Sequence, residues 1–254
     1  MSASVKDRLK RSEAVIGSWM QLPDASVAEL MGAGGFDWVA LDMEHGAIGA
    51  GALPDLVRGL EAHGTEPFAR IAQGARTDIK QVLDAGCRGV IVPSVESREQ
   101  VQEAVAAAKY PPEGSRGVGY SRANLFGRNF ATYFANINRE VVVVAQIESI
   151  RAIGNLEAIV AVPGLDALMV GPYDLSASMG LTGQFDHPEF KRAMETYESV
   201  GRRQGIPIGL HIVQPDAELL RRRIADGYRF IAYGIDAVFL SNNAINPLKA
   251  ATRG

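Results

Sequence analysis

Two carboxylates that follow neighbouring apolar runs, Glu148 and Asp174, have the chemistry of a divalent cation site. Carboxylate oxygens suit a hard cation such as Mg2+ or Mn2+, and two of them leave coordination positions for water and substrate. Spacing alone also allows a structural ion pair of Glu148 with Arg70 or Arg151. Asp174 could equally cap a short helix begun by Leu175–Ser178, since Asp is a favoured capping residue. Capping and cation binding are compatible roles for Asp174.

A histidine among acids and an arginine stand at the ends of two earlier runs. In Asp42–Gly46, the sequence Asp-Met-Glu-His-Gly places His45 beside carboxylates, an arrangement that suits a general base near neutral pH. The structural alternatives are a solvated histidine and a salt bridge of Glu44 at the rim. Arg70 ends the run Pro67–Ala69, where it could stabilise an oxyanion or form a rim ion pair.

Two further residues and one segment could line the same site. Trp19 lies in the first apolar run and could either pack in the core or form a pocket wall. Gln146 lies two residues before Glu148 in the fifth run. The segment Gly171-Pro172-Tyr173 leads into a helix whose first backbone amides would suit a substrate carboxylate.

These side chains are positioned by short apolar runs that alternate with helix-period segments, a pattern of repeated βα units and a parallel sheet. Eight runs are predicted as strands, at Val15–Met20, Trp38–Glu44, Pro67–Ile71, Gly89–Val95, Val141–Glu148, Ala167–Gly171, Ile206–Ile212 and Arg229–Ile235. Helices are predicted between them, at Ser26–Met31, Leu53–His63, Asp78–Ala85, Arg98–Ala108, Ile150–Val160, Pro188–Gln204 and Asp216–Ala225.

Eight such units predict an α/β fold, a (β/α)8 TIM barrel that forms a single domain over residues 1–254. The alternative, an open doubly wound sheet, would usually carry a glycine-rich fingerprint after its first strand, and none is present. In a barrel the active site lies at the C-terminal ends of the strands, where the polar residues above stand. The connection Tyr110–Glu140 is too long for an ordinary turn, and Ala237–Gly254 can form a last helix.

Composition excludes several classes of protein. The 254 residues are 47% hydrophobic with a net charge of −3, and the 26 basic and 29 acidic side chains are interspersed, so no nucleic-acid partner is expected. Cys87 is the single cysteine, which rules out an intrachain disulfide and favours a reducing compartment. No apolar stretch approaches the length of a membrane span. We therefore expect no membrane association and a cytoplasmic protein.

Taken together, these residues resemble the HpcH/HpaI aldolase family, the metal-dependent class II pyruvate aldolases. The order and spacing of several motifs carry the resemblance over nearly the whole chain. They are Phe36–His45, Arg70, Gly89–Pro93, Tyr110–Pro112 with Arg116–Gly117, Gln146–Glu148 and Gly171–Ser176.

The resemblance implies a role for each matching residue. Glu148 and Asp174 would bind the cation (Mg2+ or Mn2+, with Co2+ as a further candidate), which the carboxylate and keto oxygens of pyruvate would chelate. Arg70 would stabilise the enolate oxygen, and His45 would be the base. The remaining implied site residues are Asp42 and Asp84, which would orient or tune the base, Gln146 behind the cation ligands, and Trp19, Gly171, Pro172, Tyr173 and Leu210 around the substrate.

The implied reaction is the reversible aldol cleavage of a 4-hydroxy-2-oxo acid to an aldehyde and pyruvate. Hydroxypyruvate could take the place of pyruvate as the donor in the condensation direction. A cation that bridges the oxygens of a 2-oxo acid stabilises the charge that develops when the methyl proton leaves, so no Schiff-base lysine is required. In agreement, no lysine falls at the C-terminal end of a predicted strand, where a barrel aldolase would carry it. The resemblance also implies a homo-oligomer, namely a hexamer built as a trimer of dimers. The two subunits of each dimer would exchange the last helix, which here is Asp236–Ala250.

The acceptor aldehyde is not defined by these motifs. It should contact the loop Gly117–Asn129, where Tyr120, Arg122 and Asn124 could bind a carboxylate or hydroxyls, or could instead pack the loop and contact another subunit. Two alternatives to the aldolase stay open. One is a citrate-synthase-like condensing enzyme that works without metal on the same fold, and the other is a catalytically silent barrel that binds a keto acid.

Overall fold

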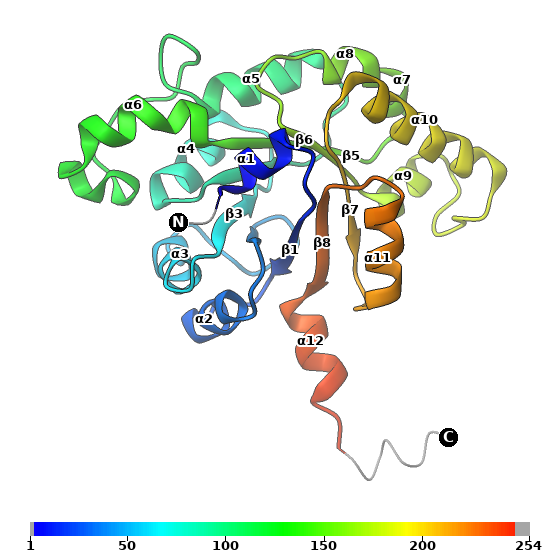
Figure 1. Cartoon of the computed structure of the whole chain (residues 1–254), viewed down its shortest axis with the longest axis horizontal. Helices are drawn as coiled ribbons and strands as arrows, with labels where there is room; N and C mark the ends of the chain where they lie inside the picture. The colour runs from blue at the N-terminus through cyan, green and yellow to red at the C-terminus, as the bar shows by residue number, and fades with distance from the viewer. Residues whose placement is uncertain (1–2, 247–254) are drawn as a thin grey trace.

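Eight parallel strands close into a barrel in the order of the chain, each one bonded to the next and β8 bonded to β1 (Figure 1). The computed structural model describes residues 3–246. The strands are β1 (Val15–Met20), β2 (Trp38–Asp42), β3 (Glu66–Arg70), β4 (Gly89–Val92), β5 (Val142–Ile147), β6 (Ala167–Val170), β7 (Ile208–Ile212) and β8 (Phe230–Ile235). The predicted (β/α)8 barrel is confirmed, and each predicted run contains a strand.

The N-terminal part of the barrel, where β2 and β8 begin with Trp38 and Phe230, is filled by stacked aromatic rings. Trp38 lies parallel to Phe230 with ring centroids 4.2 Å apart, and Phe68 packs against both rings. Gly17 on β1 makes room for this stack, because a Cβ at that position would lie 2.1 Å from the Trp38 ring. The barrel is therefore a packed core with no through-going channel at this level, and its open end is the C-terminal one.

Helices surround the barrel largely as predicted. They are α1 (Val5–Lys10), α2 (Ala25–Ala33), α3 (Leu53–Glu61), α4 (Arg76–Ala85), α5 (Arg98–Ala108), α6 (Phe130–Glu140), α7 (Ile150–Gly154), α8 (Leu156–Val160), α9 (Pro172–Ser178), α10 (Pro188–Gln204), α11 (Ala217–Ala225) and α12 (Asp236–Asn243), with a 3-10 helix η1 (Arg122–Gly127). Among the described residues, no helix is long and apolar enough to span a membrane.

One predicted helix differs from the structure, and the structure has helices at two places where none was predicted. The single helix expected over Ile150–Val160 is two short helices, because the chain leaves helical geometry at Asn155 and restarts there. The long connection Tyr110–Glu140 contains η1 and α6, neither of which was predicted. Helix α1 was not predicted; it is anchored by the buried Lys6, whose ammonium pairs with Asp166 at 3.0 Å.

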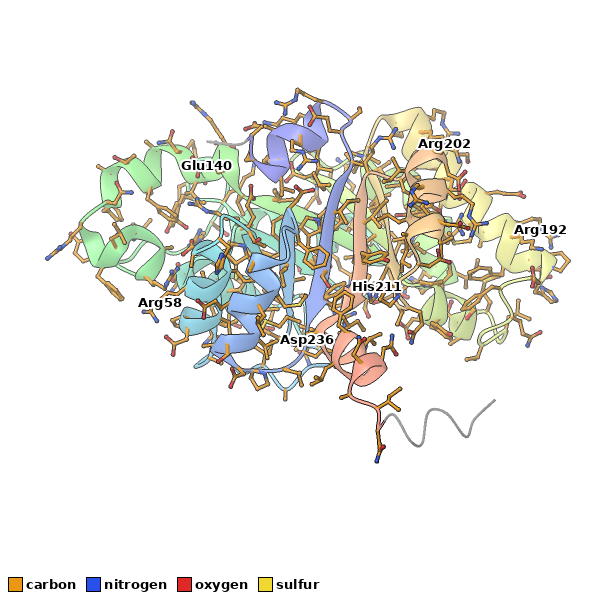
Figure 2. The ribbon with its side chains drawn as sticks, turned by 60° about the horizontal axis from the view of Figure 1, so that its bottom comes forward. Arg58, Glu140, Arg192, Arg202, His211 and Asp236 are labelled. Carbon is orange, nitrogen blue, oxygen red and sulfur yellow. The ribbon has the colours of Figure 1, made fainter. Side chains whose placement is uncertain are left out.

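The last described helix, α12, leaves the end of β8 and points away from the barrel (Figure 1). Its first residue, Asp236, lies at the barrel end, on the side of the molecule where His211 is also found (Figure 2). Leu240 on this helix is 59% exposed. The predicted last helices, Ala237–Gly254 and Asp236–Ala250, are described as helix only to Asn243, and their final residues lie outside the described part of the chain.

Candidate active site

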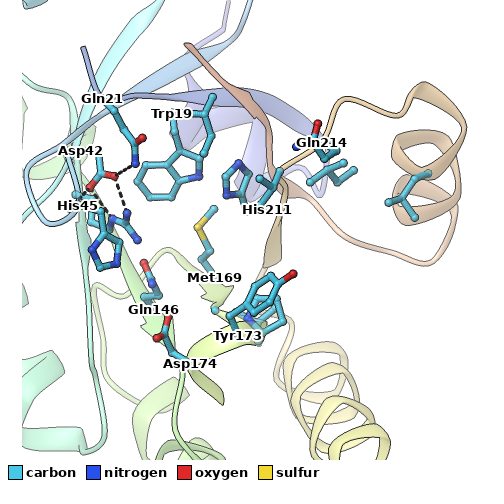
Figure 3. A pocket seen from close by; sticks show the side chains of 18 of the residues that line it. Trp19, Gln21, Asp42, His45, Gln146, Met169, Tyr173, Asp174, His211 and Gln214 are labelled. Carbon is cyan, nitrogen blue, oxygen red and sulfur yellow. Dashed lines mark hydrogen bonds and ion pairs between the residues drawn. The ribbon is translucent and has the colours of Figure 1, made fainter. Parts of the chain in front are cut away.

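A cavity of about 500 Å3 opens at the C-terminal ends of the strands (Figure 3). It is lined by most of the residues predicted from the strand ends, namely Trp19, Asp42, His45, Arg70, Gln146, Gly171, Pro172, Tyr173 and Asp174. Side chains from β1, β2, β3, β5 and the β6–α9 junction thus meet in one place, as the barrel rule predicts.

Asp42 is the fully buried centre of the polar side of this cavity. Its carboxylate accepts hydrogen bonds from two nitrogens of Arg70, Nε at 3.0 Å and Nη2 at 2.7 Å, and from Gln21 Nε2 at 2.9 Å. The backbone N–H groups of Glu44 and His45 also donate to it, each at 3.1 Å. Burial raises the pKa of Asp42, but the hydrogen bond and the charge of Arg70 outweigh it, so the pKa lies below its usual range.

Arg70 is held on three sides. Besides its paired bonds to Asp42, its Nε lies 3.2 Å from a Glu44 carboxylate oxygen, and its guanidinium stacks 4.4 Å above the Trp19 ring. Burial raises the pKa of Glu44, with the charge of Arg70 acting in the opposite direction. The ion pair considered for Arg70 therefore exists, and it fixes the guanidinium at the cavity wall.

Glu148 is buried, with 8% of its surface exposed, and it is held by neutral groups. One carboxylate oxygen accepts from the Ser94 backbone N–H at 2.5 Å and from the Ser94 hydroxyl at 3.1 Å, while the other accepts from the Gln146 amide. The structural ion pairs considered for Glu148 are not found among the described residues, since Arg70 binds Asp42 and Arg151 binds Glu96.

Ser94 reaches Glu148 through an unusual backbone conformation. Its φ of 52° lies in the left-handed region, which costs a residue with a side chain about 1 kcal/mol or more. This conformation is what aims both the N–H and the hydroxyl of Ser94 at one oxygen of Glu148. Sequence reasoning missed Ser94, because nothing in the local pattern signals a positive φ at a serine.

Asp174 lies in the first turn of α9, and Gly171 is the N-cap of that helix. The capping role considered for Asp174 is therefore wrong: the helix begins at Pro172, two residues before Asp174, because proline is well tolerated in a first helical turn. Figure 3 shows the Asp174 carboxylate beside Gln146 at the edge of the cavity.

The oxygen atoms in this corner fit a hard divalent cation. The Gln146 side-chain oxygen is buried without a hydrogen-bond partner, although the amide nitrogen of the same group is bonded to Glu148. A buried oxygen that lacks a donor is costly unless a cation, water or ligand satisfies it. The described residues contain no group of three or more His, Cys, Asp or Glu side chains arranged for a metal. A cation here would therefore rely on two carboxylates, with water and substrate as the other ligands.

His211 on β7 lines the same cavity and was not predicted. Its Nε2 lies 3.0 Å from the Gly234 carbonyl oxygen, so this nitrogen carries the hydrogen and Nδ1 is left as an acceptor. Its ring packs on Trp19 with centroids 5.7 Å apart. Burial lowers the pKa of His211 to about 4, which keeps the imidazole neutral. A signal was available, since a lone polar residue occurs near the end of the run Ile206–Ile212.

Asp236 ties the start of α12 to the cavity. This carboxylate is 4% exposed and accepts from the backbone N–H groups of Gln21 and Leu22, both at 2.9 Å, and from that of Ala237 at 2.7 Å. Because the Gln21 side chain in turn binds Asp42, a continuous set of bonds runs from α12 to Arg70.

Three further predicted site residues, Glu148, Asp84 and Leu210, do not line this cavity, although Glu148 is bonded to the cavity residue Gln146. Asp84 lies at the end of α4, where it pairs with the buried Arg116 at 2.7 Å. Asp42 was expected to orient the His45 side chain, but among the described hydrogen bonds its carboxylate accepts only from the His45 backbone N–H. Leu210 is buried on β7 and lines an adjoining cavity between β7, α10 and α11.

The three residues proposed for the acceptor contact the loop and the helices beside it. Tyr120 is 76% exposed, and its ring lies 5.6 Å from that of Phe130. Arg122 binds Glu61 at 2.6 Å and the Ala85 carbonyl at 3.0 Å. Asn124 is buried and bonds the backbone of Ser121, Gly127 and Gly119. Packing of the loop, the alternative considered for these residues, is what the described contacts contain.

Comparison with known proteins places these features in context. Residues 15–243 match the family model described as HpcH/HpaI aldolase/citrate lyase. The chain is 36% identical over 247 residues to a 2-keto-3-deoxy-L-rhamnonate aldolase of Escherichia coli strain K12, covering 95% of this chain and 90% of that protein.

Solved structures of similar proteins share the fold. A HpcH/HpaI aldolase/citrate lyase family protein from Burkholderia cenocepacia J2315 superposes with a TM-score of 0.90 at 32% identity, covering 98% of both chains. The citrate synthase SbnG superposes with a TM-score of 0.84 at 28% identity, also covering 98% of both chains.

Proposed function

This chain belongs to the HpcH/HpaI aldolase/citrate lyase family and is an aldolase, a carbon–carbon lyase, and we propose that it interconverts 4-hydroxy-2-oxo acids with an aldehyde and pyruvate or a related 2-oxo acid such as hydroxypyruvate. A divalent cation is proposed as its cofactor. The observation that carries the proposal is the Gln146 side-chain oxygen, which is buried without a hydrogen-bond partner, while the nitrogen of the same amide binds Glu148 and the Asp174 carboxylate lies beside it (Figure 3).

Glu148 and Asp174 are the proposed cation ligands, and Mg2+ or Mn2+ suits them best, with Co2+ as an alternative. Ser94 and Gln146 hold the Glu148 carboxylate in one orientation before any ligand arrives. Bound there, the cation would supply Lewis-acid stabilisation of the charge that develops on the keto oxygen of the substrate.

Arg70 lines the cavity from the end of β3. Its Nε and Nη2 are used by Asp42, which leaves Nη1 available to donate to a substrate oxygen that becomes negative. Its guanidinium is fixed by Asp42 and Trp19, so it needs no reorganisation during the reaction.

His45 is the proposed base that removes the C3 proton of pyruvate, because its imidazole lines the cavity at the end of β2. Its backbone is held by Asp42 at 3.1 Å. His211 cannot carry a charge at neutral pH, because burial lowers its pKa to about 4, so it serves as a neutral hydrogen-bonding wall.

The proposal is tested by the exchange of pyruvate methyl protons in D2O, followed by NMR, with metal-stripped protein and with added Mn2+ or Mg2+. We expect exchange only with metal. Glu148→Gln should lose metal affinity and exchange, whereas His45→Ala should keep metal affinity and lose exchange. Exchange at full rate in stripped protein, or in Arg70→Ala, would remove the proposed mechanism.

The similarity to a citrate synthase keeps a condensing enzyme as a second candidate. The two functions separate by metal dependence in an assay that contains a keto acid and an acyl donor, because a metal-independent condensing enzyme would still join them after metal is stripped. A silent keto-acid-binding barrel would bind pyruvate and exchange no protons under either condition.

We also propose that the chain forms a homo-oligomer, a trimer of dimers, through α12. This helix points away from the barrel, and Leu240 on it is 59% exposed. Helix α11 contains no buried residue in the described chain. Size-exclusion chromatography with light scattering should give a mass of six subunits, and Leu240→Asp should reduce it. A monomeric parent protein would contradict this assembly.

A further inference from the structure

The cavity has two chemically unlike sides. The polar side holds Asp42, His45 and Gln146, while Tyr173 and Gln214 lie across the cavity from it (Figure 3). The latter side is built by the segments that follow β6 and β7, and its apolar members form what we call the acceptor wall. The acceptor wall consists of Tyr173, Phe185, Val213 and Leu219.

Resting on the aldolase function proposed above, we propose that the acceptor wall selects an uncharged aldehyde that carries an apolar substituent. The 2-oxo acid occupies the polar side, so the carbonyl carbon of the aldehyde meets the pyruvate C3 near the centre of the cavity. The substituent of the aldehyde then extends over the acceptor wall.

The acceptor wall is apolar, exposed and anchored. Tyr173 is 60% exposed and Phe185 is 36% exposed, and their rings meet edge to face with centroids 5.0 Å apart. Phe185 also packs on the buried Phe190 at 5.3 Å, which fixes its position. Val213, which lines the same cavity, is 38% exposed. Clustered exposed apolar side chains at a cavity mouth gain free energy when a ligand removes water from them.

Charge in the cavity opposes an anionic acceptor. Arg70 is the one Lys or Arg among the cavity-lining residues in the described part of the chain, and it is already paired with Asp42 and Glu44. Beside the acceptor wall the charged group is Asp216, which is the N-cap of α11 and accepts from two backbone N–H groups at 2.9 Å. A carboxylate or phosphate at the far end of an aldehyde therefore meets a negative charge there.

The two cations that line the adjoining cavity are also paired. In the adjoining cavity, Lys191 binds Asp186 at 3.0 Å and Arg223 binds Asp226 at 3.3 Å. Arg122, which the sequence offered as a carboxylate ligand, is engaged by Glu61 and does not line the cavity. An anionic acceptor that used one of these cations would compete with the carboxylate already paired to it.

A homologous series of aldehydes measures the effect directly. With pyruvate, Mn2+ and the full chain, kcat/KM should rise from acetaldehyde through propanal and butanal to pentanal, by about 4-fold for each methylene buried. Succinic semialdehyde and glyceraldehyde should fall at least 10-fold below pentanal. A flat series, or a preference for succinic semialdehyde, would overturn the proposal.

Two variants locate the effect on the acceptor wall. Phe185→Ala should lower the ratio of kcat/KM for pentanal to that for acetaldehyde by about 10-fold, and Val213→Arg should raise the ratio for succinic semialdehyde to pentanal. Ratios do not depend on the fraction of folded protein. The matched control is Leu30→Ala, since Leu30 is 72% exposed on α2, outside the cavity. Unchanged ratios in both wall variants would refute the assignment.

Pyruvate deuteration in D2O, measured without any aldehyde, separates this proposal from the one on which it rests. Metal-dependent deuteration together with a flat aldehyde series would reject the acceptor wall and keep the aldolase. No deuteration would reject the aldolase mechanism itself.

Discussion

Replacement of Gly171 by alanine tests whether the packing around Glu148 supports the cation site. Gly171 has φ of −100° and ψ of 89°, which other residues adopt, so the backbone itself opposes nothing. A Cβ at this position would lie 2.8 Å from a Glu148 carboxylate oxygen and 3.0 Å from the Glu148 Cβ. Ordinary contacts are several tenths of an ångström longer, so Glu148 or the start of α9 must move.

Such overpacking in a buried site costs about 1 to 3 kcal/mol. The displaced atom is a proposed cation ligand, so we expect Mn2+ affinity to fall by roughly 10- to 100-fold, with pyruvate deuteration falling in step. Mn2+ binding is measured by isothermal titration calorimetry and deuteration by NMR. The control is Gly154→Ala, where an added Cβ meets no atom within 4 Å. Full Mn2+ affinity in Gly171→Ala would refute the placement of Glu148 as a ligand.

Further predictions concern groups around the cavity. Burial lowers the pKa of His211 to about 4, so the unfolded chain binds a proton on this imidazole more tightly than the folded chain does. The free energy of unfolding should therefore fall by up to about 3 kcal/mol as the pH drops from 6.5 towards 4. Urea melts of His211→Gln should lack this pH dependence, and a pH profile identical to that of the parent protein would contradict the prediction. Asp236→Asn should lower Tm by several degrees and kcat by several-fold, with little change in KM for pyruvate, since Asp236 fixes Gln21 and through it Asp42. Unchanged kcat and Tm in this variant would rule out the role of Asp236 in positioning Asp42. Cys87, whose pKa burial raises to about 12, should react with a thiol reagent only at the rate of unfolding, and rapid labelling of native protein would disprove it.

The strands were predictable because each one is buried on both faces. Runs such as Val142–Ile147 contain little besides apolar residues, which is typical of a parallel sheet covered by helices. The breaks within helices were not predictable in this way. Asn155 interrupts a segment whose apolar spacing continues on both sides, and α1 is fixed by the contact of Lys6 with Asp166, 160 residues away.

The cavity was predictable where a polar residue follows an apolar strand, because the barrel gathers all such ends on one face. That rule found Asp42, Arg70 and Asp174, and it should have found His211. It could not find Ser94, whose role depends on a positive φ, or Asp236, whose partners are backbone N–H groups of a segment more than 200 residues earlier. Backbone partners leave no trace in residue spacing.

The two sides of the cavity differ in whether hydrogen bonds connect their residues to one another. On the polar side, Asp236, Gln21, Asp42 and Arg70 form one connected set of hydrogen bonds, so a change at any member shifts the others. The acceptor wall takes part in none of these hydrogen bonds and is held by packing of the Phe185 ring on Phe190. Substitutions on the acceptor wall should therefore change the preferred aldehyde without altering how pyruvate is activated. Mutations of the polar side should reduce turnover with every aldehyde alike.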